Sequence, residues 1–147
     1  MEDNLNALLI FRLDARHYAI SLSLVQRVVR AAEVTPLVEA REPVLGLLNV
    51  EGEILPVMNM RCCLRMPQRD MDTSDQMIIV QTANRKICLW VDAVTEIREI
   101  PKQDIVSRER ILPDIGQIDG AIPCDDGMVL IYNPERLLSL PVMENSA

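Results

Sequence analysis

The chain has 147 residues, of which 49% are apolar but only 3% aromatic, and its 22 acidic residues outnumber 15 basic ones to give a net charge of −7. This length suits one domain or two very small ones sharing a core, and the high apolar content argues against disorder. Because nucleic acids and anionic membrane surfaces both attract Lys and Arg, the acidic balance disfavours a general nucleic-acid binder and a membrane-surface protein.

The N-terminal residues do not resemble an export signal. Glu2 and Asp3 stand where a signal peptide carries Lys or Arg, and the apolar run 7–11 is too short for a signal core. No stretch approaches the roughly 18 apolar residues of a membrane helix. We therefore expect a cytoplasmic protein without direct membrane insertion.

Most apolar segments are short and rich in β-branched residues, which is typical of strands. In the first half, strands are predicted over 8–13, 17–22, 46–50 and 53–58. Gly52 supplies the positive φ that a tight turn between the last two strands requires. Pro56 lies inside the last of them, which predicts an edge or bulged strand. Residues 61–64 are expected to form a short helical turn and the polar stretch 67–75 a linker.

The second half of the chain repeats the first. Residues 8–28 match residues 77–97 at a constant offset, and both segments predict a strand, a polar turn, a second strand and a third segment led by Val. Two further pairs match at a second offset: Gly46 with Gly120, and Asn59 with Asn133. The order and spacing of these matches indicate two similar halves.

Each half holds about five short strands, and a sheet of that size protects its edges best by curling into a barrel. We therefore predict a mainly β fold of two pseudo-repeated five-stranded barrels packed together, with short helical turns. The first barrel is expected over about residues 8–66, with additional closing elements from the C-terminus, and the second over about residues 75–138. Because each half is marginal alone, the two are expected to share a core.

No catalytic or metal-binding constellation is recognisable. The sequence has no nucleophile elbow, phosphate-binding glycine loop or H-E-x-x-H motif. The cysteines, Cys62, Cys63, Cys88 and Cys124, form no C-x-x-C pair, so free thiols are favoured over a zinc site. His17 is expected to be a surface residue of a strand. We predict no enzyme, no cofactor and no metal; a thiol-based redox or metal enzyme using the first three cysteines and His17 is the remote alternative.

An apolar stretch between the predicted strands is a candidate contact surface. It is broken by Pro36 and Pro43 and is expected to be an extended connection. Its apolar residues are Val34, Leu37, Val44 and Leu45. Exposed apolar groups would suggest a contact site, whereas the same residues could simply cover the end of a barrel. The sequence leaves both interpretations open.

Several motifs together resemble those of one known family. The most specific is 44–61, V-L-G-L-L-N-V-E-G-E-I-L-P-V-M-N-M-R. The family pattern there is G-x-x-N-x-R-G followed by an apolar strand with Pro, and this chain matches it except at Glu51. It is accompanied by Phe11, Tyr18, Val25-Gln26, 91–94 (V-D-A-V) and 128–133 (M-V-L-I-Y-N). With these motifs the chain resembles CheW-type domains, the adaptors of bacterial chemosensory arrays, from about residue 8 to residue 138. The resemblance implies a single CheW-like domain over 1–147, built of two five-stranded SH3-like barrels.

The resemblance also implies a function without catalysis. The sequence lacks the phosphoacceptor and ATP-binding regions of the homologous CheA kinases and any receiver domain, so a stand-alone adaptor is expected. It would couple the cytoplasmic tip of a chemoreceptor (a methyl-accepting chemotaxis protein) to the regulatory domain of a CheA-type histidine kinase, and would be recruited to membrane-bound receptor arrays. The alternative is a competitor or regulator that binds only one of these partners.

The resemblance carries over to particular positions. It implies kinase contacts at Val34, Thr35 and Leu37 in the first barrel. It implies receptor contacts along the groove between the barrels, at Val25, Arg27, Val28, Asn49 and Glu51.

Two of these positions depart from the family pattern. The family usually carries Arg where this chain has Glu51, and often an acidic residue where this chain has Arg27. We hypothesise that the two residues form a charge-swapped ion pair; two independent solvated charges are the alternative. Because like charges reject wrong partners, the swap points to a dedicated, non-standard chemosensory system.

Overall fold

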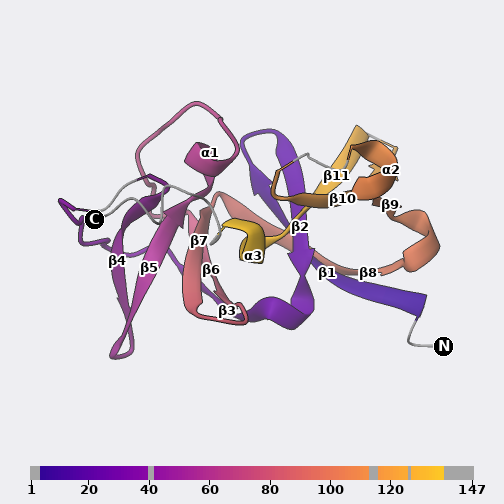
Figure 1. The fold of residues 1–147 in the computed structure, drawn as a ribbon. Coiled ribbons are helices and arrows are strands. Elements are labelled where there is room, and N and C mark those ends of the chain that lie inside the picture. Colours follow the sequence, from indigo (N-terminus) through magenta and orange to yellow (C-terminus); the bar gives the residue numbers. More distant parts are fainter. Residues whose placement is uncertain (1–3, 40–41, 113–115, 126, 138–147) are drawn as a thin grey trace.

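The computed structural model describes residues 4–39, 42–112, 116–125 and 127–137. These residues form a mainly β structure in which two sheets lie side by side, with a few short helices (Figure 1). The strands are β1 (Leu5–Leu13), β2 (Arg16–Ser21), β3 (Val25–Arg30), β4 (Val44–Val50), β5 (Glu53–Asn59), β6 (Gln76–Gln81), β7 (Lys86–Val91), β8 (Ala93–Pro101), β9 (Val106–Ser107), β10 (Ile118–Cys124) and β11 (Gly127–Tyr132). The helical turns are η2 (Leu22–Leu24), α1 (Met60–Cys63), η3 (Lys102–Asp104), α2 (Arg108–Ile111) and α3 (Pro134–Leu137). Within this described part of the chain, no helix has the length and apolar character to cross a membrane.

The strands divide into two sheets of similar size. The six-stranded sheet runs β8-β1-β2-β11-β10-β9, and its last strand, β9, has only two residues. The five-stranded sheet runs β3-β6-β7-β5-β4. The predicted mainly β fold of two similar five-stranded units is therefore confirmed, with β9 as a short addition.

The two sheets are not built from consecutive halves of the chain, so the predicted limits of about 8–66 and 75–138 do not mark the barrels. β1 and β2 pair in the sheet that the C-terminal strands close, whereas β6 and β7 pair in the sheet of β3, β4 and β5. The connections explain this arrangement, because only η2 separates β2 from β3 and only Asp92 separates β7 from β8. At neither connection does the chain reverse into a hairpin, and the third strand of each half continues into the other sheet.

This exchange of strands is reciprocal and follows the internal repeat. β3 pairs antiparallel with β6, and β8 pairs antiparallel with β1. In the same way β5 pairs in parallel with β7, and β11 pairs in parallel with β2. Each half thus supplies a hairpin to one sheet and its remaining strands to the other, which makes the chain one cooperative unit. The repeat predicted from the sequence is confirmed in the structure.

The matched glycines permit the same close approach in both sheets. A Cβ on Gly46 would lie 2.3 Å from the carbonyl oxygen of Thr35, and a Cβ on Gly120 would lie 2.6 Å from that of Val106. In each case a neighbouring backbone passes so near the strand that only glycine fits. The matched asparagines also agree, because Asn59 caps α1 and the side chain of Asn133 accepts a hydrogen bond from the backbone at the start of α3.

Replacing Gly46 with Ala is expected to lower the free energy of unfolding by about 1–3 kcal/mol, because the added methyl group overpacks against a backbone that cannot move freely. Thr35 and Leu47 exchange two backbone hydrogen bonds of 2.8 Å at this point, and the methyl group would force them apart. Urea denaturation measures the effect. The exposed control Gln26→Ala should change stability by less than about 0.5 kcal/mol, and equal stability of the two variants would contradict the close approach.

Pro56 lies in an interior strand, so the predicted edge position of this strand is wrong. β5 lies between β4 and β7 in the five-stranded sheet. Proline is tolerated because β7 pairs only with residues 57–59 of β5, which leaves Pro56 beyond the last pair. The pairing with β4 is irregular between Val44 and Gly46, so the expected bulge lies on the neighbouring strand.

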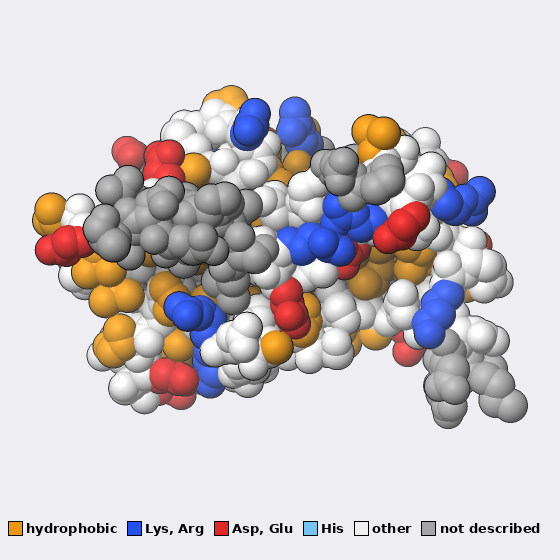
Figure 2. All heavy atoms as spheres, in the orientation of Figure 1, with side chains coloured by type: hydrophobic (Ala, Val, Ile, Leu, Met, Phe, Trp, Pro, Cys, Tyr) orange, Lys and Arg blue, Asp and Glu red, His pale blue; other side chains and the backbone are white. Residues whose placement is uncertain are grey.

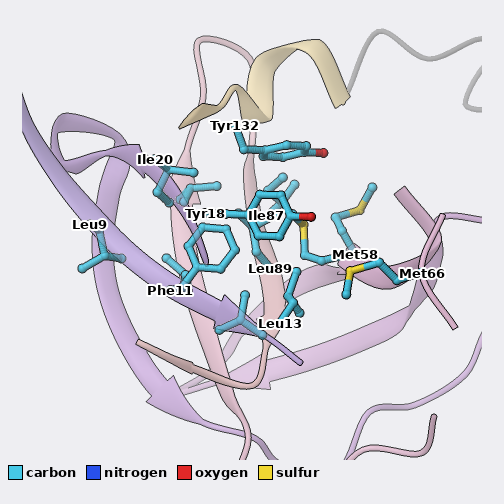
Figure 3. Close-up of a cluster of buried hydrophobic side chains, with 14 residues drawn as sticks. Leu9, Phe11, Leu13, Tyr18, Ile20, Met58, Met66, Ile87, Leu89 and Tyr132 are labelled. Carbon is cyan, nitrogen blue, oxygen red and sulfur yellow. The ribbon is translucent and has the colours of Figure 1, made fainter. Parts of the chain in front are cut away.

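The main hydrophobic core is shared between the two sheets. Phe11 and Tyr18 of the six-stranded sheet pack in one cluster with Ile87, Leu89 and Met58 of the five-stranded sheet (Figure 3). The Phe11 and Tyr18 rings stack with their centroids 5.9 Å apart. Each sheet has a second, smaller cluster of its own. The expectation of a shared core is confirmed, and it fixes the position of one sheet against the other.

Candidate functional site

Arg27 and Glu51, predicted as a charge-swapped pair, are in direct contact. Nη1 of Arg27 donates a hydrogen bond of 3.0 Å to Oε1 of Glu51. The two side chains are 46% and 75% exposed, so the pair lies on the surface and is accessible to a partner. The hydrogen bond from Arg27 and its positive charge hold the pKa of Glu51 below its ordinary value, so Glu51 is ionised at neutral pH.

The turn between β4 and β5 fixes the position of Glu51. Glu51 and Gly52 have φ values of 52° and 93°, the left-handed conformation of a tight hairpin turn, as predicted at Gly52. The side-chain oxygen of Asn49 accepts a hydrogen bond of 2.8 Å from the backbone N–H of Gly52 and closes the turn. Asn49 therefore stabilises the turn that presents Glu51 to the surface.

A second ion pair lies beside the first. Nζ of Lys86 donates a hydrogen bond of 3.0 Å to Glu53. Both ion pairs line a depression of about 180 Å³ on the five-stranded sheet. On the face of the molecule in view, acidic and basic side chains lie interspersed, without a large patch of one sign (Figure 2). The net charge of −7 is therefore not gathered in a single acidic patch on this face.

The remaining residues predicted to contact a receptor face the protein interior. Val25 and Val28 are half-buried and pack against the shared core. The structure thus brings Arg27, Asn49 and Glu51 together, and separates them from the two valines. Val25 and Val28 anchor β3 from its inner side.

Of the residues predicted to contact a kinase, Thr35 and Leu37 are exposed and Val34 is half-buried. Thr35 forms an isolated bridge with Leu47 of β4, and Val34 packs against the core of the five-stranded sheet. Leu37 is 38% exposed and the neighbouring Val38 is 97% exposed. Val44 and Leu45 are half-buried against the cores. The apolar stretch therefore covers the end of a barrel and also presents exposed apolar side chains.

An apolar groove of about 400 Å³ runs along this stretch. One wall is the connection after β3, from Ala31 to Pro36, and the other wall is Met71, Asp72 and Thr73. Residues 67–75, predicted as a linker, contain no helix or strand. They nevertheless form one side of the groove.

A cluster of charged side chains, most of them buried, lies between the two sheets. Arg61 of α1 is 1% exposed, and its Nη2 lies 2.7 Å from Asp92 and 2.8 Å from Asp14. Asp14 lies in the turn between β1 and β2, and its backbone N–H donates to Asp92 at 2.7 Å. Asp92 is the single residue between β7 and β8. The cluster therefore links the six-stranded sheet to the five-stranded sheet.

Arg69 extends the cluster into residues 67–75. It pairs with both oxygens of Asp75 at 2.8 and 2.9 Å, and with Asp92 at 2.7 Å. The indole N–H of Trp90 donates a hydrogen bond of 2.9 Å to Asp75. The guanidinium carbons of Arg61 and Arg69 lie 5.7 and 5.8 Å from the centroid of the Trp90 ring, within the range of cation–π attraction.

Comparison with known proteins identifies the family. The model of the CheW-like domain matches residues 7–142. The chain belongs to the CheW-like domain family. Among curated relatives, "Chemotaxis protein CheW" of Treponema pallidum (strain Nichols) is 20% identical over 146 residues, which cover 95% of this chain and 86% of that protein. "Chemotaxis protein CheW" of Rhizobium meliloti (strain 1021) is 27% identical over 107 residues, which cover 73% and 69% of the two chains.

A solved structure confirms the fold of this CheW-like domain. The crystal structure of the scaffolding protein TtCheW from Thermoanaerobacter tengcongensis matches with a TM-score of 0.78 and 26% identity. The match covers 87% of this chain and 88% of that one. The arrangement of two SH3-like barrels is therefore that of the family.

The buried cluster of this CheW-like domain was not predicted, although the sequence contains a signal for it. Asp92 directly follows the apolar run 87–91, and Arg61 follows the apolar stretch 54–58 closely. Charged residues at the ends of buried strands are rarely buried unless they are paired. The sequence offered no way to choose the partners of Arg61, because Asp14 and Asp92 lie 47 and 31 residues from it along the chain.

Asp75 and Asp92 of the cluster are ionised at neutral pH. Burial alone raises the pKa of Asp92, but hydrogen bonds from the backbone N–H of Asp14 and from Arg61 outweigh it and leave the pKa below its ordinary value. Burial likewise raises the pKa of Asp75, and the hydrogen bonds from Arg69 and its other partners outweigh it. Both carboxylates therefore favour the folded state while they are charged.

We expect the stability of the protein to decrease on acidification below about pH 4, where free Asp begins to bind protons. A carboxyl whose pKa is lower in the folded than in the unfolded chain stabilises the fold above the unfolded pKa, and this contribution is lost as the pH falls through the folded pKa. Asp75 and Asp92 both have this sign. Urea unfolding between about pH 7 and about pH 3 measures the decrease. It should be shallower in an Asp92→Asn variant; an equal slope would contradict the assignment.

The thiols have properties unlike those of a redox site. Burial raises the pKa of Cys62 and Cys88 to about 11 and that of Cys63 to about 12. Because the thiolate is the reactive form, these thiols are inert at neutral pH. His17 is an exposed residue of β2, as predicted. These pKa values weigh against a thiol-based enzyme.

Proposed function

We propose that this CheW-like domain is a non-catalytic scaffold that couples a chemoreceptor to a CheA-type histidine kinase in a bacterial chemosensory complex. Its relatives support this, since they are named as chemotaxis proteins and as a scaffolding protein. The observation that carries the proposal is the presence of two separate exposed surfaces on one rigid core. One surrounds Arg27 and Glu51, and the other surrounds Leu37 and the apolar groove.

We assign the cytoplasmic tip of the receptor to the first surface, with Arg27 and Glu51 as contacts, Asn49 holding the turn, and Val25 and Val28 supporting β3 from inside. We assign the regulatory domain of the kinase to the second surface, at Val34, Thr35 and Leu37. The proposed place of action is the cytoplasmic side of receptor arrays. The reversed charges of Arg27 and Glu51 favour a dedicated partner in a non-standard pathway, because an interface built for the opposite charges would meet like charges here.

Pull-down experiments test this assignment. A cytoplasmic tip fragment of a receptor and the regulatory domain of the kinase, both from the same organism, are offered to the full chain separately and together. A scaffold retains each partner alone and both at once. A competitor retains only one, or releases one when the other is added, and that outcome would favour the alternative function.

A further inference from the structure

We propose that Met71 and Asp72 form half of the kinase-docking surface, and that the groove they line receives an apolar side chain of the kinase regulatory domain flanked by Lys or Arg. The identity of the partner rests on the proposed function. The resemblance to CheW-type domains implies kinase contacts only in the connection after β3. The structure adds a second wall from residues 67–75.

The two walls of the groove are joined by Asp75. Its backbone oxygen accepts a hydrogen bond of 2.9 Å from Ala31, at the start of the first wall. Its side chain accepts a hydrogen bond of 2.8 Å from the backbone N–H of Asp72, in the second wall. Asp75 is itself buried and held by Arg69 and Trp90. The groove is therefore a preformed feature, and a partner need not order it on binding.

Apolar side chains from both walls and from β4 line the groove. They include Val34, Leu45 and Met71, which are all half-buried against the core of the five-stranded sheet. The exposed apolar side chains of Leu37 and Val38 follow closely along the chain. Exposed apolar surface next to a preformed apolar groove is typical of a protein contact site.

The charges of the groove indicate the chemistry of its partner. Among the described residues, the charged side chains that line it are Glu33 and Asp72, both acidic and both exposed. Charged groups at the rim of an interface face groups of opposite sign on the partner. An apolar side chain flanked by Lys or Arg fits this groove. The apolar side chain packs against the apolar lining, and the Lys or Arg pairs with Glu33 and Asp72.

Asp72→Lys and Met71→Ala test the proposal, with Asp70→Lys as the matched control. Asp70 lies on the same segment and is exposed, but it does not line the groove. Affinity of the full chain is measured for the kinase regulatory domain and, separately, for the receptor tip. We expect Asp72→Lys to weaken kinase binding about tenfold, because it places like charges together. Met71→Ala should weaken it about tenfold by removing an apolar contact, and Asp70→Lys should change it less than about twofold.

The outcomes separate this inference from the proposed function. If the wild-type chain binds the kinase domain but Asp72→Lys binds as tightly as Asp70→Lys, the groove is not the docking site and only this inference fails. If Asp72→Lys weakens receptor binding instead, the groove belongs to the receptor and the inference also fails. If the wild-type chain binds neither partner, both proposals fail. The carboxylate of Asp72 also accepts hydrogen bonds from the backbone N–H of Ser74 and from the hydroxyl of Thr73. Asp72→Asn keeps an oxygen for these bonds and removes the charge, so it must also weaken kinase binding if the groove is the docking site.

Discussion

Asp92→Asn is expected to lower the free energy of unfolding by about 3–5 kcal/mol, the usual cost of leaving a buried charge without its partner. Asp92 accepts hydrogen bonds from Arg61, Arg69 and the backbone of Asp14. Arg61 is 1% exposed and lies beside the ring of Trp90, and once the charge of Asp92 is removed its remaining carboxylate partner is the half-exposed Asp14. Asn has the same shape as Asp, so the change isolates the charge from the packing.

Urea denaturation followed by circular dichroism measures this effect, and two matched variants calibrate it. Asp14→Asn removes the other carboxylate that pairs with Arg61. Because Asp14 is 48% exposed, this change should lower the free energy of unfolding by less than about 1 kcal/mol. Asp70→Asn, on the exposed side of the neighbouring segment, should change stability by less than about 0.5 kcal/mol. If Asp92→Asn cost no more than Asp14→Asn, the cluster would not be what joins the two sheets.

Glu51→Arg is expected to weaken receptor binding about tenfold while leaving the fold intact, because it reverses one exposed charge of the proposed interface. In the variant, two arginines would face each other where Arg27 now pairs with Glu51 at 3.0 Å. The double variant Arg27→Glu with Glu51→Arg restores a pair of opposite sign, and should recover part of the lost affinity. Titration of the receptor tip with each variant measures both effects.

The control for this series is a surface ion pair elsewhere. Glu96 pairs with Arg98 on β8 of the six-stranded sheet, and both are exposed. Glu96→Arg reverses a charge of the same kind outside the proposed surface, and receptor affinity should change less than about twofold. If Glu51→Arg and the double variant bind the receptor as the wild-type chain does, Arg27 and Glu51 are two ordinary surface charges.

Local features of the fold were predictable because they depend on neighbouring residues. The turn at Gly52 follows from the conformational freedom of glycine. Asn59 caps α1 by accepting hydrogen bonds from backbone N–H groups only two and three residues further along the chain. The ion pair of Arg27 and Glu51 was also predictable, although its members are 24 residues apart. There the resemblance to a family, rather than any periodicity, supplied the pairing.

Pro56 and residues 67–75 show where prediction from local pattern fails. Pro56 predicted an edge or bulged strand, whereas β5 is an interior strand. Proline is tolerated there because the pairing with β7 ends at residue 57, and the length of that pairing depends on the whole sheet. The polar composition of 67–75 predicted a linker, and it forms no helix or strand. Its role as a groove wall depends on Arg69 and Asp75, whose charges are satisfied by Asp92 and Trp90 on other elements.

The sequence by itself determined the strands, the turns, the internal repeat and an acidic chain with an aliphatic core, since each depends on spacing and composition along the chain. Only the tertiary structure decided which strands share a sheet, because the short links at η2 and Asp92 carry each third strand into the other sheet. That crossing brings Arg61, Arg69 and Asp92 together and creates the groove beside Met71. Contacts between residues so distant in the chain are fixed by the packing of the two sheets around one core, and no local pattern encodes them.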